Sequence, residues 1–266
     1  MSEAGRRPGL CVLRGGGDLA TGVAWRLTRA GWPVVACELP SPLTVRRSVA
    51  VSSAVFDGEI DIDGMRAVLA ADVDEATELA ATGVVAVLVS PELADLDADV
   101  VVDARVAKRN IDTSIDDAPL VIGLGPGFVA GVDCDCVVET QRGSRLGRVL
   151  WSGAAAADTG TPGVVGGRGV ERVLRAPTDG AVAWDVAIGD LVEEGQRLGR
   201  VGDFPIDTPF AGVVRGLISE RVSLTAGMKI GDVDPRCEPS ACTEISDKAL
   251  AIGGGVVEAV LTWLNR

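Results

Sequence analysis

In the first half of the chain, short runs of consecutive apolar residues alternate with segments of helical spacing. The run from Leu10 to Arg14 is followed by a helical pattern from Asp18 to Gly31 and by a second apolar run from Pro33 to Leu39. Further apolar runs lie at 84–90, 100–106 and 119–128. Runs that are apolar at every position are typical of parallel strands covered on both faces. The pattern therefore predicts an α/β fold, with a Rossmann-like parallel sheet over residues 1–151.

The second half of the chain has a different pattern, in which short strands are separated by glycine turns. It begins after a glycine-rich connector at 152–169. Residues 176–182 then match residues 208–214 at an offset of 32, without a gap. This repeat predicts an all-β domain at 170–236 that resembles the barrel-sandwich hybrid of biotinyl and lipoyl carrier domains. Two halves that close on each other would remove their exposed strand edges.

Carrier domains of this kind present a lysine on the hairpin that joins their two halves. Here the joining segment is GDFPIDT (202–208), which contains no Lys, so neither biotin nor lipoate is expected as a cofactor. We expect the domain to be a structural element, an interaction surface or a lid. The last segment, 237–266, includes an amphipathic helix that is expected to pack back on the first domain.

The charge of the chain limits its partners. The formal net charge is −13, and an acidic surface of this kind does not favour binding to nucleic acids or to anionic membranes. The chain contains no His, which is the usual general base near neutral pH. Its start is polar, and no later run approaches the roughly 18 apolar residues of a membrane span. A soluble, cytoplasmic protein is therefore expected.

The first apolar run and the first helix are joined by a glycine-rich turn with the spacing of a dinucleotide-binding fingerprint, G-x-G-x-x-G/A. The candidate binding residues in this turn are Gly15, Gly16, Gly17, Asp18, Leu19 and Ala20. The glycines would let the backbone approach a phosphate group at the helix N-terminus. Glu38, at the end of the second apolar run, stands where an acid would bind ribose hydroxyls. Alternatively, the turn is only a tight corner with Asp18 as the N-cap of the helix.

Further candidate binding residues follow later strands. They are Arg46, Arg47, Asp103, Lys108, Arg109, Gly123, Gly125 and Gly127. The four basic residues could hold phosphates near the carboxyl ends of the strands, or they could form surface ion pairs. The three glycines could form a second anion-binding nest. The carboxylate of Asp103 stands in an otherwise apolar run, where it requires a partner or a ligand.

The chain has six cysteines, four of which form two close pairs. Cys134 and Cys136 are two residues apart, so in a strand both thiols would point to one face. Cys237 and Cys242 form the second pair. Neither pair has the C-x₂-C spacing that is common in zinc sites. We therefore expect unligated thiols or a disulfide, and we assign no metal.

Several long segments resemble one family over nearly the whole chain. They are RGGGDLATGVAWRL (14–27), PLVIGLGPGFVAGVDCDCVVET (119–140), RVLRAPTDG (172–180), GMKIGDVDPR (227–236) and ISDKALAIGGGVVEA (245–259). These segments resemble the YqeB-type accessory proteins of selenium-dependent molybdenum hydroxylase systems, which are related to xanthine dehydrogenase accessory proteins with a Rossmann domain. The resemblance implies a cytoplasmic maturation factor that binds a nucleotide or the molybdenum cofactor, a phosphorylated pterin. Its partner would be a molybdenum hydroxylase.

Three functions stay open on the sequence. The first is an accessory protein of a molybdenum hydroxylase, in which the barrel contacts the client enzyme or covers the binding site. The second is an NAD(P)-dependent oxidoreductase that uses Gly15, Gly17 and Glu38, with Lys108 or a carboxylate as proton donor. The third is an interaction scaffold whose glycines only form corners. No catalytic residue is assigned, cofactor binding is favoured over turnover, and association into a homo-oligomer is left open.

Overall fold

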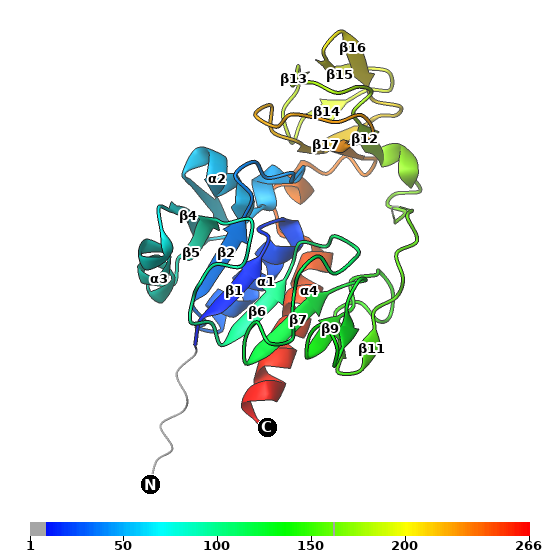
Figure 1. Cartoon of the computed structure of the whole chain (residues 1–266). Helices are drawn as coiled ribbons and strands as arrows, with labels where there is room; N and C mark the ends of the chain where they lie inside the picture. The colour runs from blue at the N-terminus through cyan, green and yellow to red at the C-terminus, as the bar shows by residue number, and fades with distance from the viewer. Residues whose placement is uncertain (1–8, 162) are drawn as a thin grey trace.

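The structure is a computed structural model and describes residues 9–161 and 163–266. It has two parts (Figure 1). The larger part, here called the large module, comprises residues 9–151 and 237–266 and contains a wide sheet with helices. The smaller part, the β module, comprises residues 170–236 and contains only short strands and one helical turn. Residues between 152 and 169 connect the two modules along one side of the molecule.

Four α-helices and four short 3₁₀ helices lie in the described ranges. The α-helices are α1 (Asp18–Arg29), α2 (Ala54–Asp57), α3 (Val73–Ala81) and α4 (Asp247–Leu264). The 3₁₀ helices are η1 (Arg47–Val49), η2 (Val51–Ser53), η3 (Val170–Arg172) and η4 (Pro239–Cys242).

The strands divide between the two modules. Those of the large module are β1 (Cys11–Arg14), β2 (Val34–Glu38), β3 (Glu59–Ile62), β4 (Met65–Ala70), β5 (Val85–Val89), β6 (Val100–Asp103), β7 (Leu120–Leu124), β8 (Val129–Ala130), β9 (Cys136–Val138) and β10 (Val149–Leu150), with β11 (Gly153–Ala154) pairing with β8. Those of the β module are β12 (Val173–Arg175), β13 (Val182–Trp184), β14 (Leu191–Val192), β15 (Arg197–Val201), β16 (Phe204–Asp207), β17 (Gly212–Leu217) and β18 (Lys229–Asp234).

The large sheet has nine strands in the order β10-β9-β7-β6-β1-β2-β5-β4-β3. The seven strands from β9 to β4 are parallel to their neighbours, and the two edge strands, β10 and β3, are antiparallel. In this register Arg14 lies beside Cys37 on one side and beside Asp103 on the other. The carboxyl ends of β1, β2, β5 and β6 therefore meet at one edge of the sheet.

Each central strand contributes to two hydrophobic cores. In β1, Cys11 and Leu13 pack on the face covered by α1 and α4, whereas Val12 packs on the opposite face with Ala76 and Ala80 of α3. All three β1 residues are fully buried. The apolar runs of the sequence are therefore strands with both faces covered.

Helices α1 and α4 pack closely because glycines lie at their contact. A Cβ atom at Gly253 would lie 2.3 Å from the carbonyl oxygen of Gly22, and one at Gly22 would lie 2.4 Å from the carbonyl oxygen of Ala249. Such distances are far below van der Waals contact. The backbones of the two helices therefore touch, and this contact holds the C-terminal helix on the large module.

The β module consists of a four-stranded sheet, β12-β18-β17-β14, and a three-stranded sheet, β13-β15-β16. Its core lies between these strands and includes the fully buried Leu198 and Ile230, which stand at equivalent positions of the sequence repeat. Strands recur at the same spacing, with β13 matched by β17 and β15 by β18. The four-stranded sheet contains strands from both halves of the repeat, whereas the three-stranded sheet contains β13 and β15 of the first half and β16 from the segment that joins the halves.

The predicted fold class is wrong in both of its parts. The large sheet is mixed rather than parallel, because the turn at Asp63 and Gly64, both with positive φ, folds β3 back against β4. The expected barrel-sandwich hybrid is not what the β module forms, because its strands belong to two separate antiparallel sheets. The strand that the repeat predicts around Leu224 is reduced to an isolated bridge with Gly180.

The two modules are joined through the segment 45–48. A Cβ atom at Gly216 of β17 would lie 2.8 Å from the carbonyl oxygen of Val45, so this strand and this segment are in backbone contact. Nε of Arg47 donates to the carbonyl of Leu217 at 2.7 Å. Oγ of Ser48 donates to the carbonyl of Cys242, just beyond the β module. The segment therefore forms the junction between the modules.

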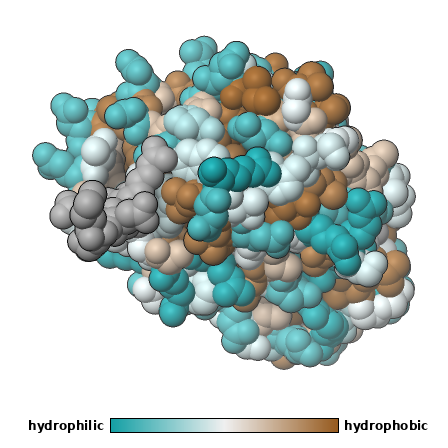
Figure 2. All heavy atoms as spheres, turned by 90° about the horizontal axis from the view of Figure 1, so that it is seen from below, coloured by the Kyte–Doolittle hydropathy of each residue, from teal (hydrophilic) through white to brown (hydrophobic). Residues whose placement is uncertain are grey.

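The surface of the large module mixes polar and apolar residues. Figure 2 views the molecule from below and shows several hydrophobic patches with hydrophilic residues between them. None of the helices in the described ranges is long and apolar enough to span a membrane.

The two neighbouring glycines Gly253 and Gly254 give opposite predictions for stability. Gly253→Ala places a methyl group against the backbone of α1, so the free energy of unfolding should fall by about 1–3 kcal/mol. In Gly254→Ala the new Cβ has no atom within 4 Å. Because Ala has a higher helix propensity than Gly, the free energy of unfolding of this variant should rise by up to about 1 kcal/mol. Urea unfolding of both variants measures the difference. Equal stability of the two would contradict the close packing of α1 and α4.

Candidate functional site

A cleft of about 630 Å³ opens where the carboxyl ends of β1, β2, β5 and β6 meet. Residues at or just after the end of each of these strands line it, among them Gly15, Glu38, Ser90 and Arg105. Open α/β sheets characteristically bind ligands at this edge. The volume is within the usual range for a site that holds a small organic molecule.

The glycine turn after β1 forms one wall of the cleft. The N–H of Gly15 donates to the carbonyl of Cys37 at 2.8 Å, and the positive φ of Gly15 (99°) turns the chain toward α1. Gly17 is the N-cap residue of α1, and no side chain caps this helix end. Gly17, Asp18 and Leu19 line the cleft. The unsatisfied N–H groups and the positive end of the α1 dipole are therefore placed where they would favour an anion.

Glu38 lies beside this turn and is partly engaged with it. Its Oε2 accepts a hydrogen bond from the N–H of Gly16 at 2.8 Å, and its Oε1 accepts one from the N–H of Leu39 at 2.7 Å. The N–H of Gly16 is consequently not available to a ligand. Each carboxylate oxygen can accept a second hydrogen bond. Because Glu38 also lines the cleft, it can accept from a ligand hydroxyl.

Asp18 does not cap the helix, since it is the first residue of α1 and Gly17 is the cap. Its carboxylate accepts a hydrogen bond from Nη1 of Arg46 at 3.2 Å. Arg46 is buried, and its Nη2 donates to the carbonyl of Ala241. The negative charge of Asp18 at the proposed phosphate position is therefore compensated by Arg46.

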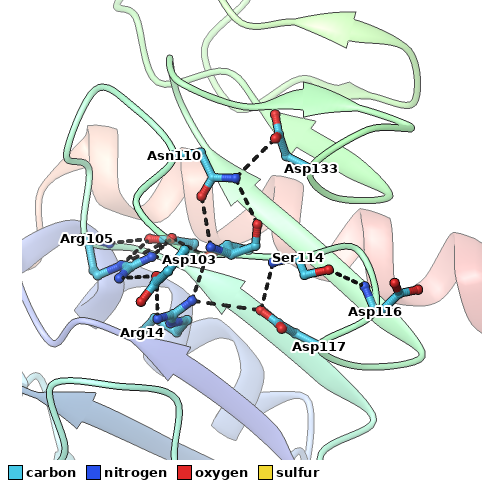
Figure 3. A network of polar contacts seen from close by, with 10 residues as sticks. Arg14, Asp103, Arg105, Asn110, Ser114, Asp116, Asp117 and Asp133 are labelled. Carbon is cyan, nitrogen blue, oxygen red and sulfur yellow. Dashed lines mark hydrogen bonds and ion pairs between the residues drawn. The ribbon is translucent and has the colours of Figure 1, made fainter.

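A network of polar side chains closes the cleft on the β1 and β6 side (Figure 3). Arg14 donates from Nη1 to Thr113 at 2.8 Å and from Nη2 to Asp112 at 2.7 Å. Arg105 donates to both oxygens of the buried Asp103, and its Nη1 pairs with Asp112 at 2.8 Å. Thr113 also donates to Asp103 at 2.7 Å. The charge of Asp103 thus has its partner in Arg105, two residues further along the chain.

This network leaves the cleft with an acidic lining. Burial would raise the pKa of Asp112, but the hydrogen bonds and charges of Arg105 and Arg14 outweigh it and lower that pKa. The two arginines of the lining face four carboxylates, those of Asp18, Glu38, Glu92 and Asp112. Both guanidiniums are already bound to carboxylates, so they do not form a free site for a phosphate.

Apolar side chains surround the mouth of the cleft. Leu39, Leu43 and Ile111 line it and are 39%, 50% and 55% exposed. Large apolar side chains that cluster around a cleft mark a binding surface. Cys37 lies deeper in the lining, where burial raises the pKa of its thiol. The thiol is therefore neutral near pH 7.

The structure brings only part of the predicted site together. Gly15, Gly17, Asp18, Leu19 and Glu38 line the cleft. The predicted residues that do not line it are Gly16, Ala20, Arg46, Arg47, Asp103, Lys108, Arg109, Gly123, Gly125 and Gly127. Among these, Lys108 forms an ion pair with Asp158 at 2.8 Å.

The second glycine loop serves packing. A Cβ atom at Gly123 would meet the ring of Phe128, one at Gly125 would meet the side chain of Thr140, and one at Gly127 would meet the backbone of Arg109. The N–H of Gly125 donates to the carbonyl of Val138 at 2.9 Å, so this donor of the predicted nest is already used.

The predicted common face of Cys134 and Cys136 is wrong. Cys134 packs in the core on the α3 side of the sheet, and Cys136 packs in the core on the α1 side. Cys134 forms an isolated bridge with Ala130, and a bend at Asp135 separates it from β9, so strand alternation does not apply between the two residues. Burial raises the pKa of each thiol to about 12. Within the described parts of the chain, no group of three or more His, Cys, Asp or Glu residues could hold a metal.

Several residues that line the cleft were not predicted from the sequence. Arg14 is the last residue of β1 and Arg105 follows β6 closely, and position at the end of a buried strand could have indicated both. Asp112 and Ile111 lie in a long loop without any such signal. Leu39 and Leu43 could be read only as ordinary apolar residues.

Two solved structures of low similarity come from the aspartoacylase family. One is an aspartoacylase family protein from Mesorhizobium loti, with 12% identity, coverage of 86% of this chain and 85% of that chain, and a TM-score of 0.28. The other is a succinylglutamate desuccinylase/aspartoacylase from Rhodobacter sphaeroides, with 14% identity, 85% coverage of each chain and a TM-score of 0.28. TM-scores this low do not indicate a shared fold.

A closer relative is found by sequence. No family model matches the chain. The chain is 46% identical over 260 residues to the uncharacterized protein YqeB of Escherichia coli (strain K12), and the match covers 97% of this chain and 48% of that protein. The chain thus spans about half the length of the curated relative it matches. Over nearly its whole length it is similar to YqeB, in agreement with the predicted resemblance to YqeB-type proteins.

Proposed function

We propose that the cleft binds a small phosphorylated ligand with a planar ring, either a nucleotide or a phosphorylated pterin. The observation that carries this proposal is the position of the uncapped N-terminus of α1 in the same cleft as Glu38 and the apolar rim. Together these features provide an anion position, a hydroxyl acceptor and a surface for a ring.

The cleft offers a different group of residues to each part of such a ligand. A phosphate would accept hydrogen bonds from the N–H groups of the first turn of α1. A ribose or similar hydroxyl would donate to Glu38, which has acceptor capacity left after its two backbone contacts. A planar ring would pack against Leu39, Leu43 and Ile111 at the mouth.

The acidic lining favours ligands of low charge. Because Arg14 and Arg105 are bound to carboxylates, the phosphate position depends on main-chain N–H groups and on the dipole of α1 alone. Additional phosphates would lie near Glu92 and Asp112 without a compensating cation. A monophosphate or an esterified diphosphate therefore fits better than a triphosphate.

In the cell, the protein would act as an accessory protein that holds this ligand for a molybdenum hydroxylase. Support comes from the sequence segments that resemble YqeB-type proteins, since the segment 14–27 forms the turn of the cleft and helix α1. The segment 245–259 forms much of α4, which packs against that helix. Binding, rather than turnover, is the activity proposed.

Titration of the full chain by calorimetry tests the ligand class. NAD and AMP should bind with dissociation constants on the order of 1–100 μM, and CTP should bind at least about tenfold more weakly. Gly17→Val should abolish this binding, because its side chain would project into the cleft. The fold should survive, since only Thr44 Oγ1 lies near a Cβ at this position, 3.8 Å away. Gly254→Ala is the control, and unchanged affinity of Gly17→Val would contradict the site.

The role of Glu38 is tested with paired ligands. The chain should bind AMP about 10–100-fold more tightly than 2′,3′-dideoxy-AMP, because a hydrogen bond to a carboxylate is worth about 1.5–3 kcal/mol. In Glu38→Gln this preference should shrink, whatever the variant does to overall affinity. A preference that stays the same in both proteins would show that Glu38 does not bind the hydroxyls.

The accessory role is tested separately. Co-expression with a xanthine-dehydrogenase-like molybdenum hydroxylase should give a complex that co-purifies, and omission of this chain should lower the cofactor content of the enzyme. Turnover of NADH with carbonyl substrates would instead favour the oxidoreductase. Normal cofactor loading without this chain would argue against the accessory role and leave the binding measurements untouched.

A further inference from the structure

A second cavity lies at the junction of the two modules. This groove has a volume of about 550 Å³ and shares no lining residue with the first cleft. One wall comes from the large module, where Arg47 and Phe56 line it. The other wall comes from the β module, where Trp184 and Arg221 line it. The proposed function makes no use of this groove.

The two arginines of the groove come from opposite walls, and neither forms an ion pair with a described residue. Arg47 uses its Nε on the carbonyl of Leu217, and Arg221 uses its Nη1 on the carbonyl of Phe56 at 2.6 Å. Both terminal nitrogens of Arg47 remain without a hydrogen-bond partner in the described part of the chain. Unused guanidinium donors of this kind suit a phosphate, a sulfonate or a carboxylate.

The carboxylates of Asp57 and Glu220, which also line the groove, offset part of the positive charge of these arginines without forming an ion pair with either. Burial lowers the pKa of Arg47, the charges of Asp57 and Glu220 oppose this, and the like charge of Arg221 adds to it. Oε1 of Glu220 accepts a hydrogen bond from the N–H of Trp184 at 2.7 Å, so this carboxylate is held by the backbone of β13. Asp57 is exposed at the end of α2. A bound anion would favour the charged form of Arg47, which burial disfavours.

Aromatic and aliphatic side chains form the rest of the groove. The rings of Phe56 and Trp184 are half-buried against the core of the β module, and Ile188 and Leu217 also line the groove. The indole N–H of Trp184 donates to the carbonyl of Ile218 at 3.0 Å, which fixes the orientation of its ring. Rigid ring faces beside cations are suited to a planar ligand.

We propose that this groove is a second ligand site, which binds a small planar organic anion. The anionic group would bridge Arg47 and Arg221, and the ring would pack against Phe56 and Trp184. Since the two arginines belong to different modules, the bound anion would also tie the β module to the large module.

The test uses the full chain and 1-naphthyl phosphate, a planar anion without a ribose. Calorimetry and quenching of tryptophan fluorescence should show saturable binding with a dissociation constant below about 1 mM. Inorganic phosphate and 1-naphthol, which lack the ring or the charge, should each bind at least tenfold more weakly. Arg221→Ala and Arg47→Ala should each lower the affinity at least tenfold. Arg200→Ala, which removes an exposed arginine of β15, is the matched control and should not change it.

Three results would overturn the proposal. The first is the absence of saturable binding to the unmodified chain, the second is equal affinity of Arg221→Ala and the unmodified chain, and the third is a loss of affinity in Gly17→Val. Gly17→Val should keep full affinity for the probe, and a loss in this variant would place the probe in the first cleft instead. Because Arg47 also contacts Leu217, its variant is checked by thermal unfolding. If it unfolds, Arg221→Ala and Trp184→Ala decide the question.

Discussion

The burial of both faces of the central strands is the constraint on which the structure depends. Side chains of β1 alternate between two hydrophobic cores, so charged groups within these strands have no access to water except at the strand ends. The parallel arrangement brings four of these ends to one edge, where Arg14 and Asp103 are neighbours in register. Polar chemistry in the large module therefore concentrates at the edge that carries the cleft.

The segment from Leu43 to Ser48 connects the two cavities. Leu43 and Thr44 line the first cleft, whereas Arg47 and Ser48 line the groove between the modules. Between them, Arg46 binds Asp18 at the start of α1 and the carbonyl of Ala241. Ligands at either cavity would contact the same short segment. A physical route for coupling between the two sites is thus present in the fold.

Predictions from the sequence failed where they depended on how strands pair. The offset of 32 residues correctly indicated equivalent strands such as β15 and β18, but it could not show that they belong to different sheets. Alternation likewise failed for Cys134, because a bend at Asp135 separates that residue from β9. The basic residues Arg46 and Arg47 were plausible ligands of the first cleft by position, yet neither lines it, because both reach toward the junction of the modules.

The sequence by itself determined the local features: the buried strands from their continuous apolar runs, the glycine turn before α1, and Glu38 at the end of β2. These follow from residue type and from neighbours along the chain. The tertiary structure decided which charges are paired. Arg14 and Arg105 both bind the carboxylate of Asp112, which is 98 residues from Arg14 along the chain. The tertiary structure also decided that Arg47 and Arg221, which form no ion pair, line the same groove between the modules. The sequence could not show this, because a local pattern does not indicate which distant side chains lie together.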